Sequence, residues 1–96
     1  MPPLTIVAHI HAAPGKAAFL RTELERLVAP TRAEAGCIQY DLHHDNADPD
    51  HFMFFELWAS RDLWQAHMQA PHIAAFGASS AGAVAGSSLY EMTPIA

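Results

Sequence analysis

The spacing of hydrophobic and polar residues predicts the first elements of this chain. Residues 4–12, LTIVAHIHA, are rich in β-branched side chains and alternate with a period of two, which predicts a strand. Residues 16–36 repeat their apolar positions with helical spacing, which predicts an amphipathic helix ending at Gly36. Pro30 lies inside this pattern, so we expect it to kink the helix or shorten it by about a turn.

The rest of the chain predicts a hairpin, further helices and a last strand. CIQYDLHH and FMFFELWAS read as strands joined by the polar turn NADPD. Ser60 is placed to N-cap a helix that ends before Pro71, and Pro71 can begin another. The small-residue tract 77–88 is interpreted as a weak helix end and a loop, with a last strand in SLYEMTPI.

The element order β α β β α β is that of the ferredoxin-like split βαβ fold, an α+β fold with an antiparallel sheet and helices on one face. The other face is left uncovered, and two sheets stacked face to face would bury it. We therefore expect a homodimer built as an α+β barrel. Phe52, Phe54 and Trp58 share one side of their strand, and we expect them to form the dimer face.

Length and composition support one small globular domain over residues 1–96. Such a chain is near the lower size at which one core suffices, and a second copy would bury further surface. Hydrophobic residues make up 51% and charged residues 16%, which excludes disorder. The formal charge is −5 and the basic residues are scattered, so we expect neither a nucleic acid nor a membrane as partner.

Cysteine content and the N-terminus predict a cytoplasmic location. Cys37 is the single cysteine, which excludes an intrachain disulfide. The start MPPLTIVAHI lacks the basic flank, the long apolar stretch and the cleavage site of a signal peptide. No apolar run approaches the roughly 20 residues that span a bilayer.

Four segments together resemble the antibiotic biosynthesis monooxygenase family, whose small members include cofactor-independent quinol monooxygenases. They are VAHIHAAPGK, AEAGCIQYDL, FFELWAS and AHMQAPHIAAF, in this order, and the match runs from about Val7 to about Phe76. The resemblance implies a dimeric ferredoxin-like fold with a substrate pocket between sheet and helices in each subunit. It leaves the substrate open, because relatives include oxygenases, haem-degrading enzymes, isomerases and proteins with no known reaction.

His67 and His72 are the histidines that invite a chemical role. His67 should point partly toward the sheet. It is either a histidine at the edge of the core, whose ring nitrogens form hydrogen bonds with backbone carbonyls or water, or a general base. An imidazole has an unperturbed pKa of about 6.5, so it can accept a proton from a phenol near neutral pH. His72 follows Pro71, where it either pins the helix junction through a local hydrogen bond or helps to position the moving proton.

The third strand and its neighbour carry polar groups whose partners are open. Glu56 shares a face with Trp58, so it must be paired, protonated or at an edge, and pairing with Arg61 or across the dimer is favoured. Trp58 is favoured as a dimer anchor over a pocket wall. Tyr40 can reach the pocket or the interface.

The chain has seven histidines, which could bind a metal ion, and the family that it resembles has relatives that degrade haem. The pairs His9–His11 and His43–His44 lack a cysteine or carboxylate partner at a fixed offset, so we expect no bound metal. Haem-degrading relatives use a histidine, an asparagine and a tryptophan. Here Phe76 and His67 stand at the histidine and tryptophan positions and the first strand has no asparagine, so we expect no haem.

The hypothesis is a monooxygenase that uses no cofactor and acts on a small quinol or polyketide-like aromatic. His67 is the catalytic base, and the substrate pocket is formed by His9, Tyr40, Trp64, His72 and Phe76. Two alternatives share such a pocket: a non-catalytic dimeric protein that binds a small metabolite, and an isomerase or lyase that shuttles protons without oxygen.

Overall fold

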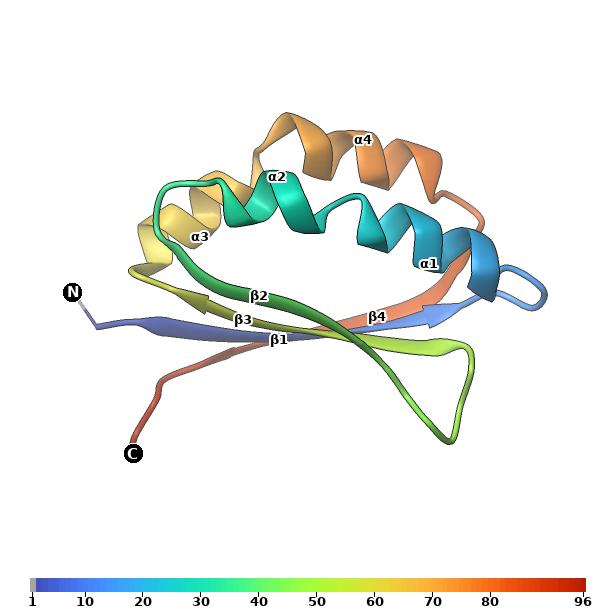
Figure 1. The fold of residues 1–96 in the computed structure, drawn as a ribbon, viewed down its shortest axis with the longest axis horizontal. Helices are drawn as coiled ribbons and strands as arrows, with labels where there is room; N and C mark the ends of the chain where they lie inside the picture. The colour runs from blue at the N-terminus through green and yellow to red at the C-terminus, as the bar shows by residue number, and fades with distance from the viewer. Residues whose placement is uncertain (1) are drawn as a thin grey trace.

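The computed structural model describes residues 2–96 and has helices on one face of a four-stranded antiparallel sheet (Figure 1). The strand order is β2-β3-β1-β4. The elements are β1 (Leu4–Ala12), α1 (Ala17–Glu25), α2 (Val28–Arg32), β2 (Cys37–His44), β3 (His51–Trp58), α3 (Arg61–Met68), α4 (Pro71–Ser79) and β4 (Val84–Met92). The ferredoxin-like α+β prediction is confirmed. None of these helices has the length and apolar character needed to cross a membrane.

The helix predicted over residues 16–36 is two helices, separated at Arg26 and Leu27. Pro30 explains where the break falls, because a proline ring clashes with the carbonyl four residues earlier, here that of Arg26. Beyond α2 the chain turns toward the sheet through Gly36, whose φ is 83°. A Cβ at Gly36 would lie 2.4 Å from Leu63 Cδ1. Only glycine therefore allows this turn to pass against α3.

Strand β4 begins at Val84, inside the tract expected to be a loop. It pairs antiparallel with β1 from Ala12↔Val84 to Thr5↔Met92. Small residues with weak strand propensity adopt this conformation because the β1 backbone offers them hydrogen-bond partners, so tertiary pairing overrides local preference. The strand also ends at Met92, earlier than predicted.

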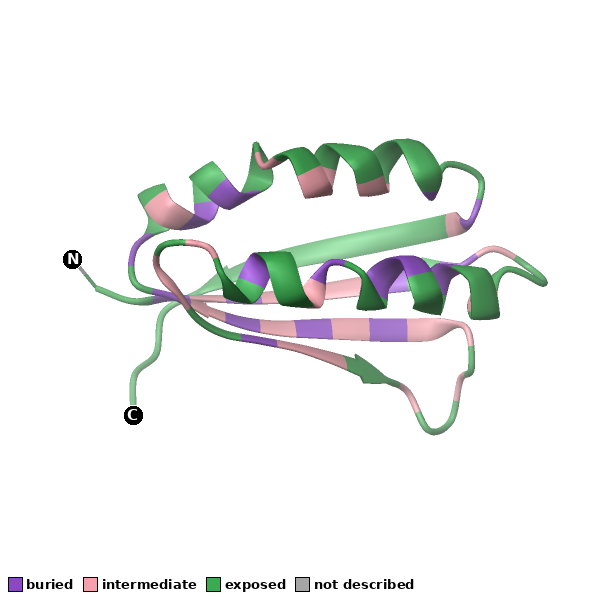
Figure 2. Ribbon diagram, turned by 45° about the horizontal axis from the view of Figure 1, so that its top comes forward, coloured by how far each residue is buried: buried purple, intermediate pink, exposed green. Residues whose placement is uncertain are grey.

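The two faces of β3 are the reverse of those expected. Phe52, Phe54 and Trp58 are 3%, 3% and 0% exposed within one chain and pack under the helices, so the prediction that they form a dimer face is wrong. Figure 2 shows buried and partly buried positions alternating along β3. Large apolar side chains occupy both sides of this strand, so alternation alone could not decide which side faces the helices. Phe55 and Leu57 point to the bare face, the side of the sheet opposite the helices.

The core lies between the helices and the sheet. Ile6, Leu20 and Leu24 are at most 1% exposed, and burying each contributes roughly 1.5–3 kcal/mol. Toward α4 and β4 the packing is incomplete, because Ile73, Phe76 and Val84 only partly cover the sheet. The fold therefore leaves space at this end of the helical layer.

Candidate functional site

The space between the sheet and helices α3 and α4 is a cavity of about 230 Å³. Its walls are mostly apolar, and Met68 and Leu89, which are 41% and 43% exposed, stand at its rim. Three titratable side chains on the helix side of the sheet reach it: Tyr40, Glu56 and His67. It is smaller than the about 300–1,000 Å³ typical of pockets for drug-sized ligands, so it suits a ligand smaller than those.

A larger hollow of about 370 Å³ lies beside α1 and β2. Charged side chains such as Arg21, Glu25 and Arg32 contribute to its lining. Small-molecule sites are usually concave and mainly apolar with a few converging polar groups. The cavity next to His67 fits that description and the charged hollow does not, so we place the candidate site at His67.

His67 comes from α3, whose start is defined by Ser60, since Ser60 Oγ accepts a hydrogen bond from the Leu63 N–H at 3.3 Å. The imidazole is buried and lies between two aromatic rings, with centroid distances of 4.8 Å to Trp58 and 5.7 Å to Tyr40. Neighbours on both sides limit the rotation of the ring. The helix and the sheet together hold His67 in one orientation at the cavity wall.

Glu34 orients the His67 ring. Its Oε2 lies 2.6 Å from His67 Nδ1, across 33 residues of chain. A carboxylate only accepts hydrogen bonds. The proton therefore lies on Nδ1, and the Nδ1–H donates a hydrogen bond to Glu34. The other nitrogen, Nε2, then keeps its lone pair and has no hydrogen-bond partner within residues 2–96. The arrangement can remove a proton from a ligand in the cavity.

Glu34 also joins His72 to this network. His72 Nε2 lies 3.1 Å from Glu34 Oε2 and 3.0 Å from the hydroxyl of the buried Thr31. Figure 1 shows α2 and α3 close together above the sheet, with the start of α4 next to them. His72 does not line the cavity, in contrast to the prediction, because its ring is turned toward Thr31 and Glu34. Its hydrogen bond is not the predicted local one either, because Thr31 is 41 residues away and the bond joins the start of α4 to α2.

Glu34, His67 and His72 are also the residues that could hold a metal ion. One ligand atom from each lies within 4.8 Å of the others. Two imidazoles with one carboxylate are a donor set that iron and zinc accept. The contacts of 2.6 Å and 3.1 Å from Glu34 Oε2 are ordinary hydrogen-bond distances, so the groups also satisfy one another without an ion.

Tyr40 and Glu56 favour their neutral forms. Burial, and next the nearby Glu56, raise the pKa of Tyr40, while the Thr31 hydroxyl opposes the shift. Burial raises the pKa of Glu56 to about 7, while its hydrogen bond from Trp58 lowers it and the charge of Glu34 raises it further. The favoured pairing of Glu56 with Arg61 is wrong, because Trp58 Nε1 donates to Glu56 at 3.0 Å and Arg61 binds Glu91.

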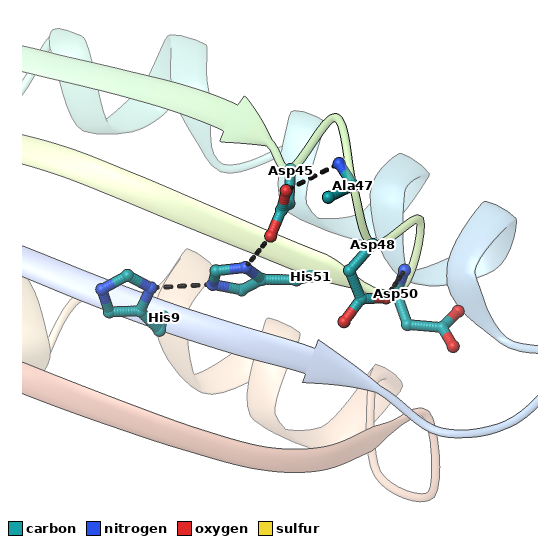
Figure 3. A network of polar contacts seen from close by, with 6 residues as sticks. All are labelled: His9, Asp45, Ala47, Asp48, Asp50 and His51. Atoms are coloured by element: carbon teal, nitrogen blue, oxygen red, sulfur yellow. Dashed lines mark hydrogen bonds and ion pairs between the residues drawn. The ribbon is translucent and has the colours of Figure 1, made fainter.

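The His9 side chain lies away from the cavity, on the bare face. Its Nδ1 is 2.8 Å from His51 Nε2, and His51 Nδ1 is 2.9 Å from Asp45 Oδ2 (Figure 3). The hydrogen bond from His51 lowers the pKa of Asp45. Because the neighbours Ala8 and Ile10 face the helices, His9 must point to the other side. His9 does border the cavity, as predicted, but its imidazole points to the bare face.

Trp64 also differs from the prediction. It packs in the core and is not among the residues that line the cavity. Its indole N–H is buried without a hydrogen-bond partner in the described part of the chain, and Arg61 lies 5.8 Å from its ring. Tyr40, His67 and Phe76 line the cavity together with His9, so four of the six residues predicted for the pocket border it.

The sequence reasoning missed Glu34, although a signal for it exists. The inward stripe of the predicted helix includes Leu27 and Thr31, and a helical repeat carries this stripe to position 34. A carboxylate at an inward position needs a partner. That partner is His67, which only the packing of α3 against the end of α2 brings near.

Comparison with known proteins supports one family. Residues 3–79 match the family model described as "Antibiotic biosynthesis monooxygenase". The chain is 36% identical over 70 residues to "Putative monooxygenase Rv0793" of Mycobacterium tuberculosis, covering 73% of this chain and 68% of that protein. It is 30% identical over 74 residues to "Uncharacterized protein sll1783" of Synechocystis, covering 77% of this chain and 50% of that protein, so it spans half that relative's length. The solved structure of PA3566 from Pseudomonas aeruginosa has a TM-score of 0.96 and 38% identity, covering 100% and 97% of the two chains.

Proposed function

The chain belongs to the antibiotic biosynthesis monooxygenase family, and from this premise we propose that it oxidises a small quinol or polyketide-like phenol with dioxygen and without a cofactor. One observation carries the proposal: His67, oriented by Glu34 at 2.6 Å, borders an apolar cavity with Nε2 free. A base in a cavity of low polarity is what activation of such a substrate requires.

The proposed chemistry begins with a proton transfer. A substrate hydroxyl gives its proton to His67 Nε2, and the carboxylate of Glu34 stabilises the imidazolium that forms. Dioxygen reacts slowly with closed-shell molecules, but a deprotonated hydroquinone readily donates an electron to it. One oxygen atom enters the ring and the other leaves as water, so a hydroquinone and dioxygen give a hydroxyquinone and water. The substrate supplies all the electrons, and no added reductant is needed.

The cavity walls favour a flat aromatic ligand. Phe54 and Phe76 border the cavity, and the Tyr40 ring stacks on Phe54 at 4.6 Å. Aromatic side chains pack well against a planar ring and exclude water, which strengthens the electrostatic interactions inside. These contacts explain how a small domain could bind a quinol while leaving its hydroxyl next to His67.

Oxygen uptake with 1,4-naphthohydroquinone, in buffer free of metal and flavin, tests the proposal. We expect turnover above the rate of autoxidation, and a loss of about 100-fold or more in kcat for His67→Gln. The melting temperature should change little, since glutamine keeps a polar side chain of similar length. His43→Gln, at an exposed position on β2, is the matched control and should keep wild-type activity.

The same assay separates the alternatives. Quinol binding without oxygen uptake would favour the metabolite-binding protein. Conversion of an enolisable substrate without oxygen uptake would favour the isomerase. Full oxygen uptake by His67→Gln would contradict the role given to the imidazole.

We also propose that the partner of the bare face is a second copy of this chain. Val7, Phe55 and Leu57 on this face lie on the central strands β1 and β3 and are only partly buried by their own chain. Tyr90 and Met92 on β4 are each 49% exposed. Stacking two sheets would remove these side chains from water, as in two-layer sheet packing.

A further inference from the structure

Glu56 is a buried carboxyl group that borders the same cavity as His67. It lies on β3, opposite Ile6 of β1 and Tyr40 of β2. Its Oε1 accepts the Trp58 indole N–H at 3.0 Å, and its Oε2 has no hydrogen-bond partner among the described residues. The side chain is 4% exposed. One oxygen is thus positioned by the protein and the other is available to a ligand.

The groups that face Glu56 provide no positive charge to pair with it. Within residues 2–96, neither lysine nor arginine lines the cavity. From β2 it meets Tyr40 and Cys37, and the end of α2 contributes Glu34, whose charge opposes ionisation of Glu56. From α3, His67 borders the same cavity, and its Nδ1 is already bonded to Glu34. Burial among these groups raises the pKa of Glu56 to about 7, so below that pH it is the neutral acid and can donate a hydrogen bond.

We propose that Glu56 is the acid of an acid–base pair in this cavity. Its protonated carboxyl donates a hydrogen bond to a substrate carbonyl oxygen, which gains negative charge when His67 removes a proton from a conjugated hydroxyl. The O–H bond of a substrate hydroxyl breaks and an N–H bond forms at His67 Nε2. The electron pair spreads through the ring to a conjugated carbonyl oxygen that faces Glu56, and that C=O bond gains single-bond character. The carboxyl proton stays on Glu56 or moves onto that oxygen. No other reactant is needed for this step.

This role follows from a general pattern of active sites. Two titratable groups in one cavity whose surroundings favour opposite proton states divide the roles of acid and base. A neutral carboxyl group stabilises an anion in a dry cavity, whereas a carboxylate would repel it. The inference rests on the proposed function for the role of His67, and among the proposed substrates it selects a phenol whose hydroxyl is conjugated through the ring to a carbonyl oxygen.

Calorimetric binding of 2-hydroxy-1,4-naphthoquinone tests the role of Glu56 without any oxygen chemistry. The anion of this compound shares its charge between two conjugated oxygens and is present at both pH values used. We expect the wild type to bind it about ten-fold tighter at about pH 6 than at about pH 8.5, because Glu56 loses its proton between them. Glu56→Gln cannot ionise and should bind tightly at both values.

Two further variants make the result specific. Glu56→Leu lacks the donor and should bind weakly at both values, and circular dichroism checks that it is folded. Glu25→Gln, at an exposed position on α1, should keep the wild-type pH dependence. The same pH dependence in Glu56→Gln as in the wild type, or no saturable binding by the wild type, would overturn the inference. Failed oxygen uptake with this binding pattern intact would overturn the monooxygenase proposal and leave the role of Glu56 standing.

Discussion

At the scale of single residues, the account depends on Glu34 fixing the proton of His67 on Nδ1. Glu34→Gln replaces an acceptor with an amide that can also donate to Nδ1, which would place the proton on Nε2 and block the base. We expect kcat/KM to fall on the order of 100-fold, with little change in thermal stability. Oxygen-uptake kinetics check this, with Glu25→Gln as the surface control. Equal losses in both variants would contradict it.

Glu56 makes a separate prediction about stability. Its folded pKa of about 7 lies above the ordinary value of 4.5, so the folded state keeps a proton that the unfolded state has released. This contribution to stability is present at low pH, is lost as pH rises from about 4.5 to about 7, and stays lost above. The full loss is roughly 3 kcal/mol. Urea unfolding should show that Glu56→Gln lacks this decline, and a parallel decline in both proteins would contradict the assignment.

At the scale of elements, local pattern predicted most strands and helices but not their limits or sides. β1, the β2–β3 hairpin and the α3 cap were readable because alternation, turn residues and Ser60 act locally. The start of β4 at Val84 is not predictable from local pattern, because its conformation depends on pairing with β1. Local pattern also does not tell which side of β3 faces the helices, because both of its faces are apolar. Glu34 could not be paired with His67 because their contact exists only after α2 packs near α3.

The turn at Gly36 gives a prediction for how α2 and α3 fit together. Gly36→Ala places a Cβ 2.4 Å from Leu63 Cδ1 at a φ of 83°, so either α3 or the turn must move. We expect a loss of about 2–4 kcal/mol in unfolding free energy and reduced activity through displacement of His67. Gly15→Ala has a similar φ of 76° with open space around it and should cost only about 1 kcal/mol. Equal losses in the two variants, measured by urea unfolding, would show that the clash with α3 is unimportant.

At the scale of the whole molecule, two adjacent residues of β3 allow the core and the proposed dimer contact to be tested separately, because their side chains lie on opposite faces of the sheet. Phe55→Lys should dissociate the dimer while circular dichroism stays native, because Phe55 points to the bare face. Phe54→Lys should instead unfold the chain, because Phe54 is 3% exposed in the core and a buried unpaired charge costs several kcal/mol. Sedimentation equilibrium distinguishes these results. A wild type that is monomeric at micromolar concentration would contradict the dimer.

The central claim, that His67 with Glu34 activates a substrate for direct reaction with dioxygen, is tested most directly by isotope labelling. Metal-free and flavin-free protein is mixed with 1,4-naphthohydroquinone under ¹⁸O₂, and the product is analysed by mass spectrometry. The account predicts a hydroxyquinone with a single ¹⁸O atom from the wild type and only the background of autoxidation from His67→Gln. Unlabelled product, or equal labelling by both proteins, would contradict it.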